Sequence, residues 1–325
     1  MNIWHFFLSV ALYGSLFSVL TLALNFQYAR GGMINFGTVA YFAAGAYAYA
    51  IITQEPPSGL DQYMFGFGAP WWLGVAGAGA AAFAFAVVTG GPTLRLRGEY
   101  LALTTFAFAE VFHSLLLNER RIGNGSVGLP NVSRPDFGSL AAYDTLIYTG
   151  AAFLLMVATI LLFRRILRSP YGRALDAVRD DEVAAKAIGK DAARLRFQVF
   201  VLSAIPMGIA GALYAMVTTL VAPNLFTAEV TFFVWIALVL GGERTIVGAV
   251  LGTVALVAFQ ELVRAVPFES VRSAQIAASI EEVVTGLLFI IVLRWQPWEK
   301  LARKRTAKCQ TTISSSTKSP SASLL

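Results

Sequence analysis

The sequence predicts an all-α polytopic membrane protein, a helical bundle with about nine transmembrane segments. Of its 325 residues, 57% are hydrophobic and only 14% are charged, whereas soluble globular proteins average about 45–50% apolar and about 25% charged residues. The mean hydropathy is +0.65. Because a soluble surface needs the charges that are missing here, lipid is expected to surround most of the chain.

Nine apolar runs predict the individual helices, since about 20 apolar residues cross a hydrocarbon core. The first run lacks the basic flank and the cleavage site of a signal peptide, and it is expected to be retained as a span. The remaining runs follow at intervals set by polar or Gly/Pro-containing segments. The nine lie at residues 6–26, 34–53, 71–89, 100–117, 143–163, 197–220, 230–240, 246–263 and 276–293.

The seventh run, 230–240, is too short for an ordinary span at about 1.5 Å per residue. It ends in Gly241-Gly242-Glu243-Arg244, after which the eighth run begins. Two short helices in a tight hairpin are favoured, and a re-entrant loop buried by protein is the alternative. Either arrangement returns the chain to the same side, so the orientation of the other spans does not depend on the choice.

The basic residues predict the orientation. When the connecting segments are assigned to alternating sides, 20 of the 25 Lys and Arg residues fall on one side. Cytoplasmic loops hold the excess of basic residues, so the N-terminus is expected outside and the C-terminus in the cytoplasm. The net charge of +6 is then a sign of orientation rather than of nucleic-acid binding.

One domain is expected, a transmembrane domain over residues 1–302, followed by a disordered cytoplasmic tail over residues 303–325. The tail is basic and then rich in Ser and Thr, with no apolar periodicity. It contains Cys309, the single cysteine. One cysteine and two histidines exclude a disulfide framework and a Cys/His zinc site.

The longest inside segment before the tail, residues 164–196, is expected to fold as two short helices. Ser169 can cap the first helix, and Pro170 suits its first position. The second helix is expected from Glu182 to Ile188, with Gly189 as its C-terminal stop. A folded platform at the membrane surface is therefore predicted.

The first helix of this platform has one apolar face. Tyr171, Leu175 and Val178 lie at i, i+4 and i+7, and charged side chains cover the rest of the helix. The apolar face has two possible uses. It can lie on the bilayer or on its own bundle, or it can be a docking surface for a cytoplasmic partner.

Polar residues within a span are functional candidates, because ionisable groups at membrane depth are costly. Glu110 and His113 lie one turn apart in the run 100–117, where they can share a hydrogen bond. They are candidates for lining a translocation path, and an interhelical hydrogen bond is the alternative. The sequence contains neither a G-x-x-x-x-G-K-[ST] phosphate-binding loop nor an H-E-x-x-H motif, so an enzyme is not expected.

Several segments resemble LivM-type permeases of branched-chain amino acid ABC transporters. The inside run 168–191, RSPYGRALDAVRDDEVAAKAIGKD, is similar to their cytoplasmic loop, and LRLRGEYLALTTFAFAEVFHSLLLN at 94–118 matches a further segment. Residues 31–47, 124–130, 203–214 and 239–252 are also similar, so that the resemblance covers about residues 20–297. Thr38 stands where the family often has His.

The resemblance implies one of two permease subunits of an ABC importer in the bacterial inner membrane. Its partners would be a second, LivH-like permease subunit, two cytoplasmic ATPase subunits and a periplasmic substrate-binding protein. The substrates would be branched-chain or related apolar amino acids, with urea or short amides as the alternative within the family. A stand-alone secondary transporter is the alternative outside it. The chain itself would bind no cofactor, since the partner subunits hydrolyse ATP.

The resemblance also implies that the platform couples the permease to its ATPase subunits. The residues assigned to coupling are Ser169, Pro170, Tyr171, Gly172, Arg173, Leu175, Val178, Arg179, Glu182, Ala185 and Gly189.

Overall fold

The computed structural model describes residues 3–56, 65–96, 98–136, 143–243 and 245–265, with a few isolated residues between 279 and 290. The chain divides into two compact units, Met1–Pro267 and Phe268–Leu325. Only the isolated residues belong to the second unit, so the following concerns the first. The expected tail at 303–325 lies outside the described residues, as does most of the expected span at 276–293.

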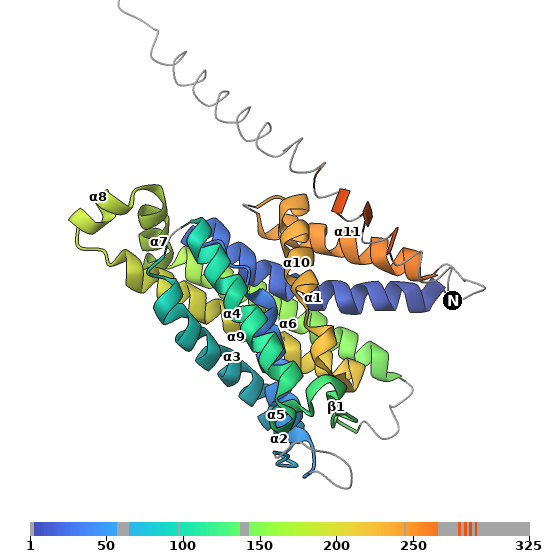
Figure 1. Ribbon diagram of the computed structural model, residues 1–325. Helices are drawn as coiled ribbons and strands as arrows, with labels where there is room; N and C mark the ends of the chain where they lie inside the picture. Colours follow the sequence, from blue (N-terminus) through green and yellow to red (C-terminus); the bar gives the residue numbers. More distant parts are fainter. Residues whose placement is uncertain are drawn as a thin grey trace, which may run out of the picture. The chain divides into compact units, whose positions relative to one another are not determined.

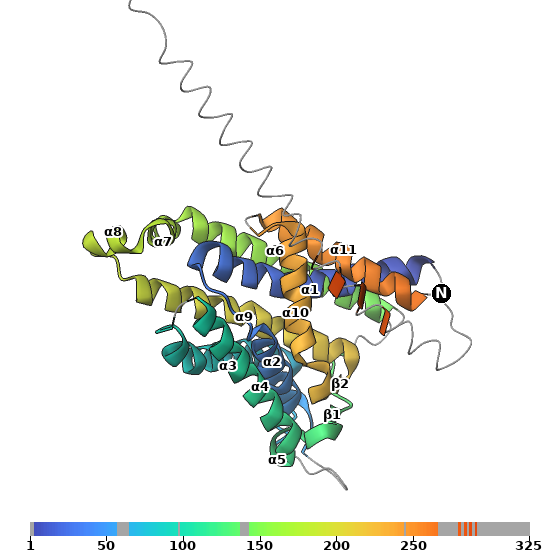
Figure 2. The ribbon, with the colours of Figure 1, turned by 45° about the horizontal axis from the view of Figure 1, so that its top comes forward.

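The first unit is a bundle of helices (Figures 1 and 2), as the composition predicts. Among its described residues, seven helical stretches are long and apolar enough to cross a membrane, and α2 is a shorter apolar helix. The elements are α1 (Ile3–Gly31), α2 (Thr38–Thr53), α3 (Trp71–Thr93), α4 (Glu99–Asn118), α5 (Arg120–Gly123), the 3-10 helix η1 (Gly125–Val127), β1 (Leu129–Pro130), α6 (Asp144–Arg168), α7 (Pro170–Asp180), α8 (Glu182–Ala187), α9 (Ala192–Thr218), β2 (Leu220–Val221), the 3-10 helix η3 (Pro223–Leu225), α10 (Ala228–Gly241) and α11 (Ile246–Ala265).

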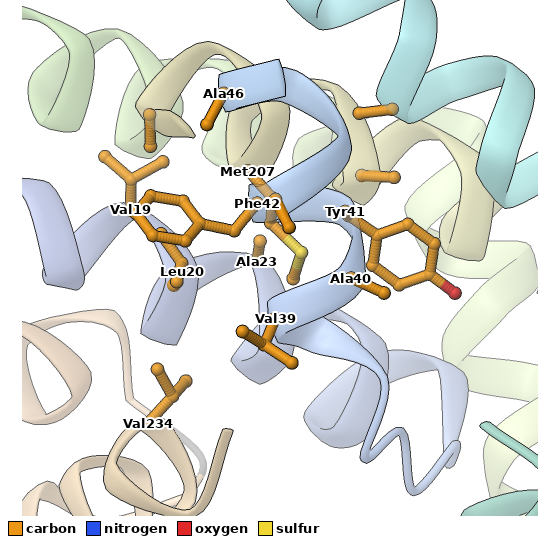
Figure 3. Packing of buried hydrophobic residues seen from close by; sticks show 14 of the residues in the cluster. Val19, Leu20, Ala23, Val39, Ala40, Tyr41, Phe42, Ala46, Met207 and Val234 are labelled. Atoms are coloured by element: carbon orange, nitrogen blue, oxygen red, sulfur yellow. The ribbon is translucent and has the colours of Figure 1, made fainter. Parts of the chain in front are cut away.

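The core lies where α1, α2, α9 and α10 meet. Figure 3 shows Phe42 of α2 among apolar side chains that include Val19 of α1 and Met207 of α9. Helices α2 and α9 approach so closely that a Cβ on Gly211 would lie 2.8 Å from the backbone nitrogen of Ala46 and nearer still to the carbonyl oxygen of Phe42. Small residues allow such close approach of transmembrane backbones.

Between α1 and α2 the chain is not helical, although the apolar run begins at residue 34. Gly32 has a φ of +63°, and a buried polar network holds the following residues. Asn35 Nδ2 donates to Gln27 Oε1 over 2.8 Å, and Gln27 Nε2 donates to Ser203 Oγ of α9 over 2.6 Å. The backbone N–H of Gly37 donates to Asn35 Oδ1 over 2.7 Å. The second helix therefore starts four residues later than its hydrophobicity predicts.

The seventh and eighth runs form two helices, α10 with 14 residues and α11 with 20. They turn at Gly242, which has a φ of +96°. The helices meet through Gly241, Gly248 and Gly252, where any Cβ would clash with the backbone of the other helix. The turn lies beside α1, because Asn25 Nδ2 donates to the carbonyl oxygen of Glu243 over 2.7 Å. The two runs thus form a pair of packed helices, and both helices are longer than the apolar runs predict.

The segment between α4 and α6, which was expected outside, contains α5, η1 and β1 among its described residues. Strand β1 pairs antiparallel with β2, matching Leu129 with Val221. The loop is also tied to α2, since Gln54 Nε2 donates to Pro130 O over 2.7 Å and Tyr49 Oη donates to Ser133 O over 2.8 Å. These bonds fix the loop against the end of the bundle at which α2 ends.

Candidate functional site

Helices α7 and α8 lie at the end of the bundle where α6 ends and α9 begins, and α8 forms its extremity in both views (Figures 1 and 2). Helix α7 begins at Pro170, as predicted, after Ser169 in extended backbone conformation. The predicted side-chain cap does not form. The hydroxyl of Ser169 instead donates to the carbonyl oxygen of Ile166 over 2.6 Å, so it closes the end of α6 rather than the start of α7.

The apolar face of α7 is turned toward its own bundle. Leu175 is 1% exposed and Val178 is 3% exposed. The Tyr171 hydroxyl donates to the carbonyl oxygen of Leu195 in α9 over 3.1 Å, and burial raises its pKa to about 12. Of the two uses that the sequence left open for this face, the structure shows packing on its own bundle, because these side chains attach α7 to α6 and α9.

Two small residues of the predicted set serve this packing. A Cβ on Gly172 would clash with the backbone of Leu167, so glycine allows the tight corner between α6 and α7. Ala185 of α8 is buried with Val178 of α7 and Ala192 of α9 in a separate small apolar cluster. This cluster holds α8 against the two helices on either side of it in the sequence.

Charged residues fix the start of α8, and a glycine follows its end. Asp181 Oδ1 accepts from the backbone N–H groups of Val183 and Ala184 over 2.9 and 3.0 Å, which caps the helix. Glu182 lies between two cations, 2.9 Å from Lys186 Nζ and 3.1 Å from Arg196 Nη1. The bond to Arg196 links α8 to α9. At the other end Gly189 has a φ of +78°, as expected of a helix stop.

The large exposed apolar side chains of the described segment from Ser169 to Arg196 belong to α8 and the residue after it. Val183 is 79% exposed and Ile188 is 71% exposed, and Ala184 and Ala187 are also exposed. We call these four residues the α8 patch. Arg173 of α7 is exposed and Arg179 is half-buried. Large apolar side chains on a protruding, otherwise charged segment are typical of a protein contact.

Glu110 and His113 are both partly buried in α4, but they do not form the expected pair. His113 Nε2 donates to the carbonyl oxygen of Pro223 in η3 over 3.1 Å. Within the described ranges no hydrogen bond or ion pair joins Glu110 to His113. The ring of Phe106, one turn before Glu110, lies 6.3 Å from the ring of Phe232 of α10 at a tilt of 48°. Glu110 therefore lies on the side of α4 that faces η3 and α10. In the same described ranges, no cluster of His, Cys, Asp and Glu side chains could hold a metal ion.

The family model described as branched-chain amino acid transport system / permease component matches residues 6–293. The chain belongs to this family. The permease is 30% identical to the high-affinity branched-chain amino acid transport system permease protein LivM of Escherichia coli, over 90% of its own length and 71% of the relative's. It is 26% identical to a probable LivM of Methanocaldococcus jannaschii, over 89% of its own length and 91% of the relative's.

The permease is also similar to a second kind of relative, the LivH permease protein of Salmonella typhimurium, at 27% identity over 91% of its length and 94% of the relative's. These relatives are permeases and not enzymes, as the sequence predicts. No solved structure matches the permease.

The sequence located the platform of the permease but not its exposed surface. The residues that sequence reasoning missed are Val183 and Ile188, which stand out from the bundle, and Asp181, which caps α8. An Asp directly before a helical segment is a known N-cap signal and could have been found. A helix of six residues has too few turns to show an apolar period, so no signal marked the two apolar side chains.

Proposed function

We propose that this permease is one of the two transmembrane subunits of an ABC importer in the bacterial inner membrane. Branched-chain or related apolar amino acids would reach it from a periplasmic binding protein and cross between it and a LivH-like subunit. Two ATPase subunits would drive the step. The observation that carries this proposal is the α8 patch, an apolar surface at the end of a membrane bundle in a chain that has no phosphate-binding loop.

The contacts of α7 and α8 with the rest of the bundle would transmit a movement of the platform to the membrane-spanning helices. An ATPase bound to the α8 patch would move α8, and the bond from Glu182 to Arg196 ties α8 to α9. The buried side chains of Leu175 and Val178 hold α7 against the same bundle. A rigid corner of this kind transmits motion because its buried side chains cannot yield without opening cavities. ATP would be bound and hydrolysed by the partner subunits, with no cofactor on this chain.

The proposal is tested by purifying the tagged permease from native membranes in mild detergent. We expect a second permease and an ATPase with a G-x-x-x-x-G-K-[ST] motif to co-purify. Reconstituted with these subunits and the binding protein, the permease should take up leucine when ATP is supplied. Uptake of urea with no uptake of leucine would assign the substrate to short amides. Leucine uptake by the permease alone, without ATP, would overturn the proposal in favour of a secondary transporter.

The proposed orientation places the N-terminus outside and the platform in the cytoplasm. We expect Ser133→Cys, made with Cys309→Ser, to react with an impermeant thiol reagent in intact cells, because Ser133 is an exposed residue of the loop that follows α4. Native Cys309 should react only after the membrane is opened. Labelling of Cys309 in intact cells, with none at position 133, would invert the orientation.

Glu110 and His113 are proposed to line the translocation path beside η3 and α10. Since His113 already donates to Pro223, Glu110 is not needed as its partner, and the carboxylate is available to water or substrate. We expect Glu110→Leu to reduce uptake more than Glu110→Gln, because the amide keeps a polar group in the path. Rates of leucine uptake at matched protein level measure this. Wild-type rates in both variants would remove Glu110 from the path.

A further inference from the structure

An ion pair joins the platform to the first helix of the bundle. Arg30 lies in the last turn of α1 and Asp176 lies on α7, 146 residues further along the chain. Arg30 Nη1 lies 2.9 Å from Asp176 Oδ1, with 35% and 44% of the two side chains exposed. Among the residues that the structure describes, no other ion pair joins α1 to α7. Asp176 takes no part in the apolar packing of α7, so its contact with α1 is separate from the contacts that seat the helix.

Arg30 directly precedes the break between α1 and α2. The chain leaves the helix at Gly31 and turns at Gly32, which has a φ of +63°. A helix end that adjoins a non-helical segment can change direction with only a few backbone torsions, as hinges do. A force on the Arg30 side chain therefore acts next to the segment between Gly31 and Thr38, where the helical hydrogen bonds of α1 and α2 are interrupted.

The other end of the break is attached to α10. Trp235 Nε1 donates to the carbonyl oxygen of Asn35 over 3.0 Å. Thr231 Oγ1 accepts from the backbone N–H of Val39 over 3.2 Å and lies 3.1 Å from Thr38 Oγ1. All these groups are buried. The short segment from Gly32 to Gly37 is thus held by the platform at one end and by α10 at the other.

We propose that Arg30 and Asp176 are positioning residues that carry the movement of α7 to the break between α1 and α2, and from there to α10. The inference rests on the proposed function, since it needs an ATPase to move the platform. Helix α10 lies beside α4, the helix that carries Glu110 and His113, so the route ends next to the proposed path. An ion pair suits the role because a half-exposed pair contributes little to folding. Its loss should leave the bundle intact.

The experiment compares Arg30→Asp, Asp176→Arg and the double charge exchange in the reconstituted importer. We expect each single variant to keep its ATPase subunits and to hydrolyse ATP, while leucine uptake per ATP falls about tenfold, the size typical of a coupling between sites. The double exchange restores the attraction and should recover uptake per ATP to within about twofold of the wild type. Arg165→Asp is the matched control, because it removes an exposed arginine of α6 on the same side.

Three results would overturn the inference. Wild-type uptake per ATP in both single variants would show that the pair carries no motion. Failure of the double exchange to recover, with the complex assembled, would show that the residues act separately. An equal loss in Arg165→Asp would make the effect one of net charge. If the wild-type permease binds no ATPase at all, the proposed function fails first, so the two failures are distinguishable.

Discussion

Replacing Val183 and Ile188 together with aspartate is expected to abolish ATPase co-purification and ATP-driven uptake, while the permease accumulates at its normal level in the membrane. Both side chains are more than two-thirds exposed, so nothing in the bundle loses packing. Protein interfaces concentrate their energy in a few apolar anchors, commonly about 2 kcal/mol or more each. Two carboxylates in their place would also have to lose their water on docking. Pull-down of the ATPase with the tagged permease measures the effect.

Two comparisons show what the result means. Val127 of η1 is 67% exposed. It lies in the chain between α5 and β1, which Figure 1 shows at the other end of the bundle from α8, so Val127→Asp should leave ATPase co-purification unchanged. Leu175→Ala should instead lower the amount of folded permease, because emptying a buried leucine site costs about 2–5 kcal/mol. If the Val183/Ile188 variant retains its ATPase, the α8 patch is not the docking surface.

The second large effect is expected at the crossing of α2 and α9. Gly211→Ala should sharply reduce the thermal stability of the permease in detergent, since the new Cβ would meet the backbone of Phe42 and Ala46. Overpacking of a core costs about 1–3 kcal/mol and occasionally more, and backbone atoms cannot move aside as a side chain can. Size-exclusion profiles after heating measure the loss.

Gly150→Ala in α6 is the matched control for this crossing. Nothing lies within 4 Å of a Cβ at Gly150, and alanine favours a helix over glycine by about 0.8–1 kcal/mol. The control should therefore be at least as stable as the wild type. A Gly211→Ala variant that is equally stable would mean that α2 and α9 do not pack as closely as described.

The bundle could be predicted from composition and apolar runs, because lipid selects about 20 apolar residues wherever a helix crosses it. The start of α2 could not. Its position depends on Gln27, Asn35 and Ser203, which bond across the fold. The apolar runs separated the first two helices, but hydrophobicity along one segment does not contain the partners that polar groups find in distant segments. The late start of α2 at Thr38 was therefore missed.

The platform shows the same limit at the site. The i, i+4, i+7 spacing of Tyr171, Leu175 and Val178 correctly predicted an apolar face, but an amphipathic helix presents the same pattern to its own bundle as to a partner. The spacing of Glu110 and His113 likewise placed them one turn apart, whereas the His113 ring reaches Pro223, 110 residues away. Patterns within one helix establish which side chains share a face, and the tertiary fold decides what that face meets.

The most direct test of the account is a photo-crosslinking residue placed at Val183 in cells that make the whole importer. After illumination and purification in denaturant, we expect the permease to carry a covalently attached ATPase, identified by its G-x-x-x-x-G-K-[ST] peptide in mass spectrometry. The same residue at Val127 should attach no ATPase. Attachment of the ATPase at Val127 and not at Val183 would contradict the account, as would adducts at Val183 that contain only lipid.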